Sequence, residues 1–457
     1  MQEAQIMMPL PEASAAVMSK QQEIMQELEL RRRMKTVVVP TNDGEVRRLL
    51  RELGEPITLF GEREMERSDR LRKIYALNDY AAPSGLTLEP AAQLVSQKEI
   101  FYTEGSDQLK SARLQIAQES LKRAARRLHS ERQRMEANGH GDQEELPLRH
   151  LINQVSEIGD DRPIVGCVFS PDGSQLLTGS WSGAVKIWDS ASCRVVTSIK
   201  AHTDRVTGVA WNPNVAGTST EGVAFVSGAT DGTACLWSKE GHCQATLSGH
   251  TDRLGRVAFH PFGRHVGTAS FDTTWRFWDI ATSTCLQEQE GHSRAVYAIA
   301  FQGDGALAAT GGMDATGRLW DLRTGRNIMK LEGHVKSILA ADFSPNGYHV
   351  ATGSEDNTAH VFDLRKKGTL TILPGHTSLI STVRFEPITG SYLLTCGYDK
   401  VSKLWAGRTL RLAKTLAGHD GKVMAGDISP DGACLIATAG YDRTLKLYSP
   451  DALALSI

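Results

Sequence analysis

Histidine side chains recur along the chain at a spacing that could support acid–base or metal chemistry. Six of them follow Ala or Gly at steps of 42 to 48 residues: His202, His250, His292, His334, His376 and His419. Imidazole is a common general base and metal ligand, but an active site needs such groups to converge on one place. Because these histidines recur once per repeat, each belongs to its own structural unit. We therefore expect structural roles, with no catalytic residue, metal ligand or cofactor.

Seven aromatic residues define that repeat. Each ends a short strand-like segment, as in KIWDS, RFWDI and RLWDL, and they are Trp188, Trp237, Trp278, Trp320, Phe362, Trp405 and Tyr448. Successive aromatics lie 41 to 43 residues apart after a first step of 49. A period of about 40 to 45 residues, with Gly-His before and Trp-Asp after, resembles the WD-repeat family. We expect an all-β seven-bladed WD-repeat propeller over residues 151–457, with a mainly α-helical, partly extended N-terminal arm.

The repeat also predicts how the ring closes. Residues 444–449 form the third strand of the last repeat, and only eight residues follow them. The last blade therefore lacks an outer strand, which residues 151–158 (LINQVSEI) can supply. Such closure pairs the first and last blades and removes an exposed sheet edge.

The WD-repeat resemblance implies a role for the histidines. In that family the His before a blade, the Asp of the turn after its second strand and the Trp of its third strand are hydrogen-bonded as a clasp. The matching sets here are His202, Asp231 and Trp237; His250, Asp272 and Trp278; His292, Asp314 and Trp320; and His376, Asp399 and Trp405. A buried Asp needs donors, which imidazole and indole provide. The first blade has Asp160 and Ser182 instead, and Phe362 and Tyr448 replace Trp elsewhere, so we expect those blades to open more readily.

The residues just before these turns suggest a binding face. Five of the seven are aromatic or Met: Trp181, Phe271, Met313, Tyr398 and Tyr441. Aromatic loop residues suit a protein-binding hot spot, so we take them as candidate partner contacts. The alternative is that neighbouring loops cover them.

Composition excludes several classes of protein. The net charge of −2 argues against broad attraction to nucleic acid, so an RNA contact would have to be local. The seven cysteines form no CxxC pair and most fall in strand patterns, which favours buried reduced thiols over disulfides or zinc. No long apolar run or charged-then-apolar leader is present, so we expect neither a membrane span nor a secretion signal.

The first 150 residues contain no Trp and no Cys and lack the repeat. We divide them into an N-terminal helix and tail (1–36), a motif region (37–75), a connector with a basic helix (76–136) and a linker (137–150). Within 37–75, a helix over TNDGEVRRLLRELGEP carries an apolar stripe, and a second helix covers residues 62–74. These elements look too small to bury a core, so we expect a partner to complete them. Candidate partner contacts are Val39, Pro40, Leu49, Leu50 and Leu53.

A strongly helical pattern covers residues 107–136. Its expected apolar stripe is Leu114, Ala117, Leu121, Ala124, Ala125 and Leu128. Eight basic residues accompany that stripe: Lys110, Arg113, Lys122, Arg123, Arg126, Arg127, Arg132 and Arg134. Such density suits a phosphate backbone, which makes these residues candidate RNA contacts. The alternative is a solvated helix face that docks on the propeller or on a partner.

The segment VVVPTNDGEVRRLLRELGEPITLFGEREMERSDRLRKI resembles the splicing-factor motif of two spliceosomal protein families, one of which also carries seven WD repeats. That family is the WD-repeat subunit of the U4/U6 small nuclear ribonucleoprotein. The resemblance continues through YTEGSDQLKSARLQIAQESLKRAARRL, SFDTTWRFWD, GGMDATGRLWDLRTGR, FSPNGYHVATGS and YDRTLKLY, and covers roughly residues 17–450.

The resemblance implies a nuclear, non-catalytic scaffold. Its partners would be sibling proteins of the U4/U6 particle, a cyclophilin among them, the base-paired U4/U6 RNA, and U5 particle proteins within the U4/U6.U5 tri-snRNP before splicing. WD repeats alone are weak evidence for function, because many scaffolds share them. The alternative is an adaptor of another complex, such as a substrate receptor of a ubiquitin ligase. Bound small nuclear RNA would discriminate the two.

Overall fold

The computed structural model divides into two compact units, Met1–Thr103 and Glu104–Ile457. The structure describes residues 29–30, 33–34, 37, 39–40, 43–57, 62–78, 106–137, 148, 150–214, 222–432 and 434–450. Among these residues, no helix combines the length and the apolar character that a membrane crossing requires. Most of the N-terminal helix and tail predicted over residues 1–36 lies outside the described residues; within it, residues 29–30 and 33–34 are helical.

The first unit contains the helices α2 (Asp43–Glu52) and α3 (Glu64–Asn78). They bury Val46, Leu50 and Leu71 completely against one another. Arg67 of α3 is buried and forms an ion pair with Asp43 at the start of α2. The expectation that a partner is needed to bury this core is wrong, because α3 covers the apolar stripe of α2.

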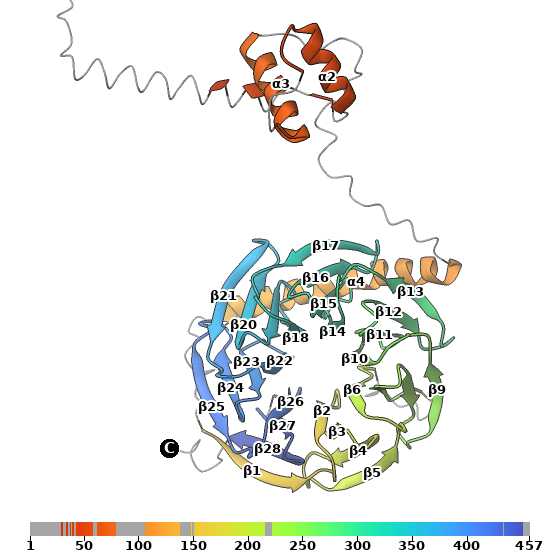
Figure 1. The fold of residues 1–457 in the computed structure, drawn as a ribbon. Helices are drawn as coiled ribbons and strands as arrows, with labels where there is room; N and C mark the ends of the chain where they lie inside the picture. Colours follow the sequence, from red (N-terminus) through yellow and green to blue (C-terminus); the bar gives the residue numbers. More distant parts are fainter. Residues whose placement is uncertain are drawn as a thin grey trace, which may run out of the picture. The chain divides into compact units, whose positions relative to one another are not determined.

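The second unit is a ring of seven four-stranded antiparallel sheets (Figure 1). The first blade consists of β2 (Ile164–Phe169), β3 (Gln175–Ser180), β4 (Ala184–Asp189) and β5 (Val195–Lys200). The second consists of β6 (Val206–Trp211), β7 (Phe225–Ala229), β8 (Ala234–Trp237) and β9 (Cys243–Leu247). The third consists of β10 (Leu254–Phe259), β11 (His265–Ser270), β12 (Trp275–Asp279) and β13 (Cys285–Gln289). The fourth consists of β14 (Val296–Phe301), β15 (Leu307–Gly312), β16 (Gly317–Asp321) and β17 (Arg326–Leu331).

The remaining blades follow the same order from the centre outward. The fifth consists of β18 (Ile338–Phe343), β19 (His349–Ser354), β20 (Thr358–Asp363) and β21 (Gly368–Pro374). The sixth consists of β22 (Ile380–Phe385), β23 (Tyr392–Gly397), β24 (Val401–Ala406) and β25 (Leu412–Ala417). The seventh consists of β26 (Val423–Ile428), β27 (Ile436–Gly440), β28 (Thr444–Pro450) and β1 (Leu151–Ile158). The predicted seven-bladed propeller is confirmed.

Burial differs between the strands of one blade. Several second strands, such as β11 and β23, are buried along their whole length, because both of their faces pack against neighbouring blades. Outer strands such as β5 are largely exposed, which places Val195 and Val196 at the surface. The expectation of buried thiols is wrong for Cys243 and Cys285, which begin outer strands and are exposed, although all seven cysteines are free.

Closure of the ring follows the prediction from the sequence. Strand β1 pairs antiparallel with β28, from Leu151 opposite Pro450 to Ile158 opposite Thr444. The first strand of the ring thus completes the last blade (Figure 1). Lys414 of the sixth blade also donates to the carbonyl oxygen of Leu151 at 2.6 Å. The strand is therefore held by two blades.

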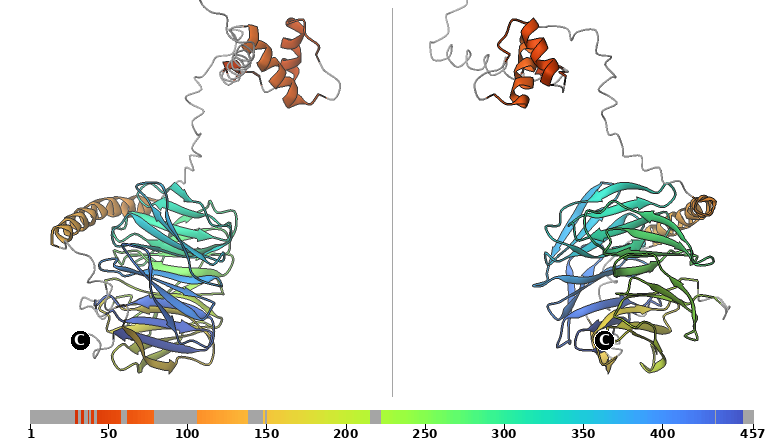
Figure 2. Two further views of the ribbon diagram at one scale, coloured as in Figure 1. Left: turned by 90° about the vertical axis from the view of Figure 1, so that its left-hand side faces the viewer. Right: turned by 45° about the vertical axis from the view of Figure 1, so that its right-hand side comes forward.

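The helix α4 (Asp107–Ala137) belongs to the same unit as the ring. Two views show it lying across one flat side of the disc (Figure 2). It contacts strand β13, turns between the first and second strands, and turns between the third and fourth strands of successive blades. Because consecutive strands run antiparallel, turns between second and third strands lie on the opposite side. The five candidate aromatic and Met contacts are therefore on the side that α4 leaves free.

Candidate partner and RNA surfaces around the propeller

The clasp of the fourth blade is a chain of four hydrogen-bonded side chains. Trp320 Nε1 donates to Thr310 Oγ1 at 2.8 Å, and this hydroxyl lies 2.8 Å from His292 Nε2. His292 Nδ1 lies 3.0 Å from Asp314. An indole can only donate and a carboxylate accepts, so Thr310 accepts from Trp320 and Asp314 accepts from His292. The four side chains thus form one continuous chain of hydrogen bonds.

The same arrangement recurs around the ring. The clasp residues expected from the sequence come together within single blades, each with one additional hydroxyl: Thr268 with His250, Asp272 and Trp278; Thr395 with His376, Asp399 and Trp405; Ser227 with His202, Asp231 and Trp237. This hydroxyl was not predicted from the sequence. The sequence pattern that marks this hydroxyl is a Ser or Thr ten residues before the aromatic in every blade.

The clasps that depart from the pattern still hold most of their hydrogen bonds. In the first blade, Ser180 and Ser182 both donate to Asp160, and Trp188 donates to Thr178 at 2.8 Å. In the seventh blade, His419 lies 2.8 Å from Asp442 and 2.8 Å from Thr438. Each of these blades therefore keeps a carboxylate that accepts hydrogen bonds.

The fifth blade differs most, because Phe362 has no N–H to donate. His334 there lies 2.8 Å from Asp356 and 2.8 Å from Thr352. Burial disfavours the charge of Asp356, but hydrogen bonds from Thr358 and His334 outweigh it and hold the pKa at about 2. Burial also lowers the pKa of His334. The pair is therefore an ionised carboxylate and a neutral imidazole near pH 7.

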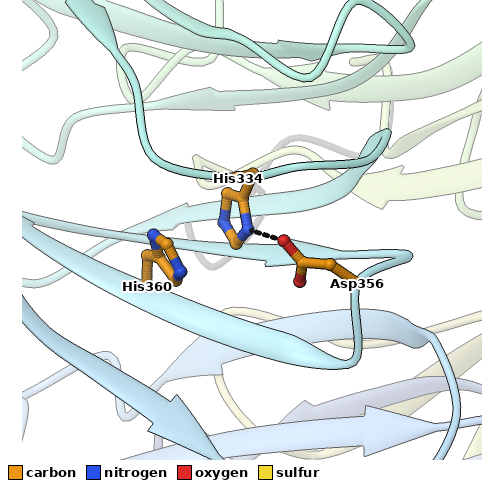
Figure 3. Close-up of side chains that lie close together, drawn as sticks. All are labelled: His334, Asp356 and His360. Carbon is orange, nitrogen blue, oxygen red and sulfur yellow. Dashed lines mark hydrogen bonds and ion pairs between the residues drawn. The ribbon is translucent and has the colours of Figure 1, made fainter.

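His360 is a second histidine in this blade (Figure 3), and five of the other six blades have Lys or Arg at its position. Its ring stacks on that of His334, with centroids 3.8 Å apart and an angle of 24° between the planes. Ring nitrogen lone pairs lie in the ring plane, so two nearly parallel stacked imidazoles cannot both point at one ion. Both nitrogens of His334 are already hydrogen-bonded. His334, Asp356 and His360 thus form a packed structural group rather than a metal site.

The free side of the disc carries the candidate aromatic contacts. Trp181 of the first blade meets Tyr441 of the seventh edge to face, with centroids 5.8 Å apart. Cations cover other rings: Arg253 lies 4.0 Å from the centroid of Phe271, and Lys422 lies 4.8 Å from that of Tyr398. Tyr441 is exposed, and the candidates Trp181, Phe271, Met313 and Tyr398 are half-buried. Neighbouring residues therefore cover these side chains in part, and the rest of their surface is open to solvent.

On the opposite side, the first half of α4 packs through apolar residues. Leu109, Ala112 and Ile116 are buried in one cluster with residues of the third and fourth blades, including Phe262 and Leu322. The stripe expected from the sequence does not make this contact. Leu114, Leu121 and Leu128 are instead exposed. The docked face and the predicted stripe are therefore on different sides of the helix.

Basic side chains hold the second half of α4. The guanidinium of Arg127 binds the carboxylate of Asp304 through Nε and Nη2, at 2.8 to 3.1 Å, and also donates to the carbonyl oxygen of Asn346. Arg123 lies 4.6 Å from the centroid of Phe262. Arg134 donates to the carbonyl oxygen of Ile388 at 3.1 Å.

The eight candidate RNA contacts therefore divide into two groups. Arg113, which donates to Gln287 at 3.0 Å, joins Arg123, Arg127 and Arg134 in contacting the ring. The other four are exposed: Lys110, Lys122, Arg126 and Arg132.

A cavity of about 1230 Å³ lies beneath α4 and is lined by that helix and by inner strands of the ring. Its lining includes Arg123 and Arg126 of the helix. On the inner strands, Arg384 lies 3.6 Å from both Asp342 and Asp427. Burial raises the pKa of Asp342 to about 6 in spite of Arg384. Asp342 and Asp427 also accept backbone N–H groups of the neighbouring blades, so this charged group ties inner strands together.

The candidate partner contacts of the first unit differ in how far they are buried. Val39, Leu49 and Leu50 are buried in the core between α2 and α3. Pro40 and Leu53 are half-buried. Only the latter two keep surface that a partner can reach.

Comparison with known proteins adds to this geometry. The family model described as the IFT122 first beta-propeller matches residues 163–449, which is more than half of the chain. The chain belongs to this β-propeller family. A second model, described as pre-mRNA processing factor 4 (PRP4) like, matches residues 46–74, which span most of α2 and α3.

Three relatives illustrate the similarity. The chain is 43% identical over 255 residues to the U4/U6 small nuclear ribonucleoprotein PRP4-like protein of Arabidopsis thaliana, covering 52% of this chain and 45% of that protein. It is 45% identical over 205 residues to U4/U6 small nuclear ribonucleoprotein Prp4 of Homo sapiens, covering 43% and 39%. It is also 40% identical over 252 residues to an uncharacterized WD repeat-containing protein of Schizosaccharomyces pombe, covering 52% and 53%. The matches span about half or less of each relative's own length.

These findings confirm the resemblance recognised in the sequence. A PRP4-like motif and a β-propeller occur in one chain, and relatives that carry the U4/U6 name match it at 43 to 45% identity.

Proposed function

We propose that this protein is a non-catalytic scaffold of the U4/U6 small nuclear ribonucleoprotein, which supports assembly of the U4/U6.U5 tri-snRNP and pre-mRNA splicing in the nucleus. The observation that carries the proposal is the combination of a PRP4-like motif, folded as α2 and α3, with a seven-bladed propeller. The names of the similar proteins support it.

The arrangement of the histidines supports a non-catalytic role. Each His–Asp pair is fixed within its own blade by a hydroxyl and, in most blades, by an indole. Imidazoles that already use both nitrogens in contacts within the clasp have no free group for acid–base chemistry. The ring instead offers two broad sides for binding, one covered by α4 and one that carries cation-capped aromatic residues.

The experiment is purification of the tagged full-length protein from nuclear extract, with sequencing of the bound RNA and mass spectrometry of the bound proteins. We expect U4 and U6 RNA together with sibling proteins of that particle, including a cyclophilin, and U5 proteins at low salt. A variant that lacks residues 43–78 is informative, because these helices form a core of their own and their loss should leave the propeller folded. That variant should no longer copurify with U4 and U6 RNA or with the proteins of that particle. Copurification of a ubiquitin ligase without small nuclear RNA would refute the proposal.

The RNA contact is a finer part of the proposal. The exposed cations Lys122 and Arg126 lie four residues apart on α4, on one side of the helix. Removing one cation that binds a phosphate should lower the slope of log affinity against log salt by about 0.9. The double change Lys122→Glu and Arg126→Glu should therefore reduce the slope for a U4/U6 duplex by roughly 2. Lys239→Glu, an exposed change on the ring, is the matched control and should leave the slope unchanged.

A further inference from the structure

The outward side of α4 carries an apolar stripe that the propeller does not use. Leu114, Leu121 and Leu128 follow one another at seven-residue spacing, and their exposed fractions are 57, 64 and 47%. At about 100° per residue, this spacing keeps the three side chains on one face. The buried residues Leu109, Ala112 and Ile116 lie on the opposite face. The helix thus has two apolar sides, of which one is docked.

The helix is held firmly enough to present this stripe as a fixed surface. Apolar packing fixes its first half, and Arg127 fixes its second half through Asp304 and Asn346. A surface helix normally has a single apolar face toward the core and polar residues elsewhere. A second stripe of leucines, repeated every seven residues, is the pattern that pairs two helices side by side. Alanines at 117, 124 and 125 between the leucines leave room for a close neighbour.

Charges around the stripe indicate the partner's chemistry. Lys110 lies four residues before Leu114, and Arg132 lies four residues after Leu128, so an exposed cation stands one turn beyond each end of the stripe. Lys122 is exposed beside its centre. A partner helix that covers the leucines would have its two ends opposite Lys110 and Arg132 and one flank opposite Lys122, where Asp or Glu is favoured.

We infer that the Leu114–Leu121–Leu128 face binds an acidic amphipathic helix of another protein, with large apolar residues at seven-residue spacing and carboxylates on its flanks. Leucine side chains offer nothing to a phosphate backbone, so this face favours a protein over RNA. The inference rests on the proposed function only in taking the partner from the same particle.

The first experiment replaces Leu121 by the photo-crosslinking residue benzoylphenylalanine in full-length protein expressed in cells. Val196→benzoylphenylalanine is the control, because Val196 is similarly exposed on the outer strand β5 of the ring. After irradiation, the Leu121 position should crosslink to a segment of another protein with the predicted heptad and acidic pattern, and the Val196 position should not. Crosslinks to RNA, to a second copy of this chain or to its own residues 1–105, or the absence of any crosslink at Leu121, would each overturn the inference.

The second experiment measures binding of a defined probe by the purified full-length protein. The probe is a fluorescent helical peptide of about four heptads, with leucine at its core heptad positions and glutamate at the flanking positions. Leu114→Ser, Leu121→Ser and Leu128→Ser together should weaken its binding by about tenfold or more, whereas Val196→Ser should have no effect. The melting temperature of the triple variant should equal that of the wild type, since these side chains are exposed. Equal binding by the triple variant and the wild type would overturn the inference.

The two proposals fail in different ways. If U4 and U6 RNA copurify with the protein while Leu121 crosslinks to no partner helix, the inference fails and the proposed function stands. If the helix crosslink forms but the complex contains no U4 or U6 RNA, the docking face stands and the proposed function fails.

Discussion

Loss of Asp314 should destabilise the fourth blade more than loss of any exposed acid on the ring. Asp314 accepts from His292 Nδ1 at 3.0 Å, from Ser293 N at 3.2 Å and from Thr316 N at 3.2 Å. Its side chain is 6% exposed and that of His292 is 1% exposed. Replacement by Ala leaves the buried Nδ1–H without an acceptor, at a cost of about 1 to 3 kcal/mol, and removes two further bonds at the blade's turn. We expect a total loss of about 3 kcal/mol.

The assay is thermal unfolding of the full-length protein, combined with hydrogen exchange of single segments. At roughly 2 °C per kcal/mol for a unit of this size, Asp314→Ala should lower the melting temperature by about 6 °C. Hydrogen exchange should accelerate first in β15 and β16, which carry Thr310 and Trp320 of the same clasp. The physical reason is that His292 no longer has the acceptor that fixes its orientation.

Two control variants test whether the loss of stability is specific to the clasp or follows from removing any acidic or hydroxyl group. Asp252→Ala removes an exposed carboxylate that accepts from Arg253 N, and it should change stability by less than about 0.5 kcal/mol. Ser182→Ala removes one donor from Asp160, which keeps Ser180 and Lys186, and should cost about 1 kcal/mol or less. If Asp314→Ala lost no more stability than these two controls, the structural interpretation of the clasps would be refuted.

Three further predictions address closure, docking and pH. Deletion of Leu151–Ile158 should sharply lower the melting temperature of the ring, because β28 loses its outer neighbour; an unchanged value would mean that another segment closes the ring. Arg127→Ala should cost about 2 kcal/mol and expose the second half of α4 to proteolysis, whereas Arg126→Ala should do neither; equal cleavage of the two variants would contradict the docking role of the ion pair. Lowering the pH from about 6.5 to 4 should destabilise the fifth blade, because burial holds the pKa of His360 at about 4 and the unfolded chain takes up the proton first. His360→Gln should flatten this part of the curve of melting temperature against pH, and a curve parallel to that of the wild type would count against the buried neutral state.

The repeat made the ring predictable from sequence. The regularly spaced aromatic in each blade marks its third strand. The extra strand at residues 151–158 can only be the missing outer strand of the last blade. The small hydroxyl of each clasp was not predictable, because Ser and Thr are common in strands and turns. Its fixed distance of ten residues before the aromatic becomes meaningful only when the side chains are seen to meet.

The orientation of α4 was less accessible to sequence reasoning. The stripe at Leu114, Leu121 and Leu128 is the stronger apolar pattern, yet the helix docks through Ile116 and its neighbours. The deciding contact is polar: Arg127 reaches Asp304, 177 residues away along the chain. No local periodicity contains that information, because the acceptor's place depends on the complete fold. The core between α2 and α3 was missed for a similar reason, since α3 alone shows little amphipathic pattern.

The pairing of β1 with β28 has a consequence for synthesis of the protein. The ribosome makes β1 about 290 residues before its partner, which at 5 to 20 residues per second is a delay of roughly 15 to 60 seconds. During that time six blades can form in order, while the edge of β1 has nothing to pair with and remains open to other chains. Completion of the ring therefore waits for β28, and the unpaired edge of β1 can meet other chains until β28 has been made.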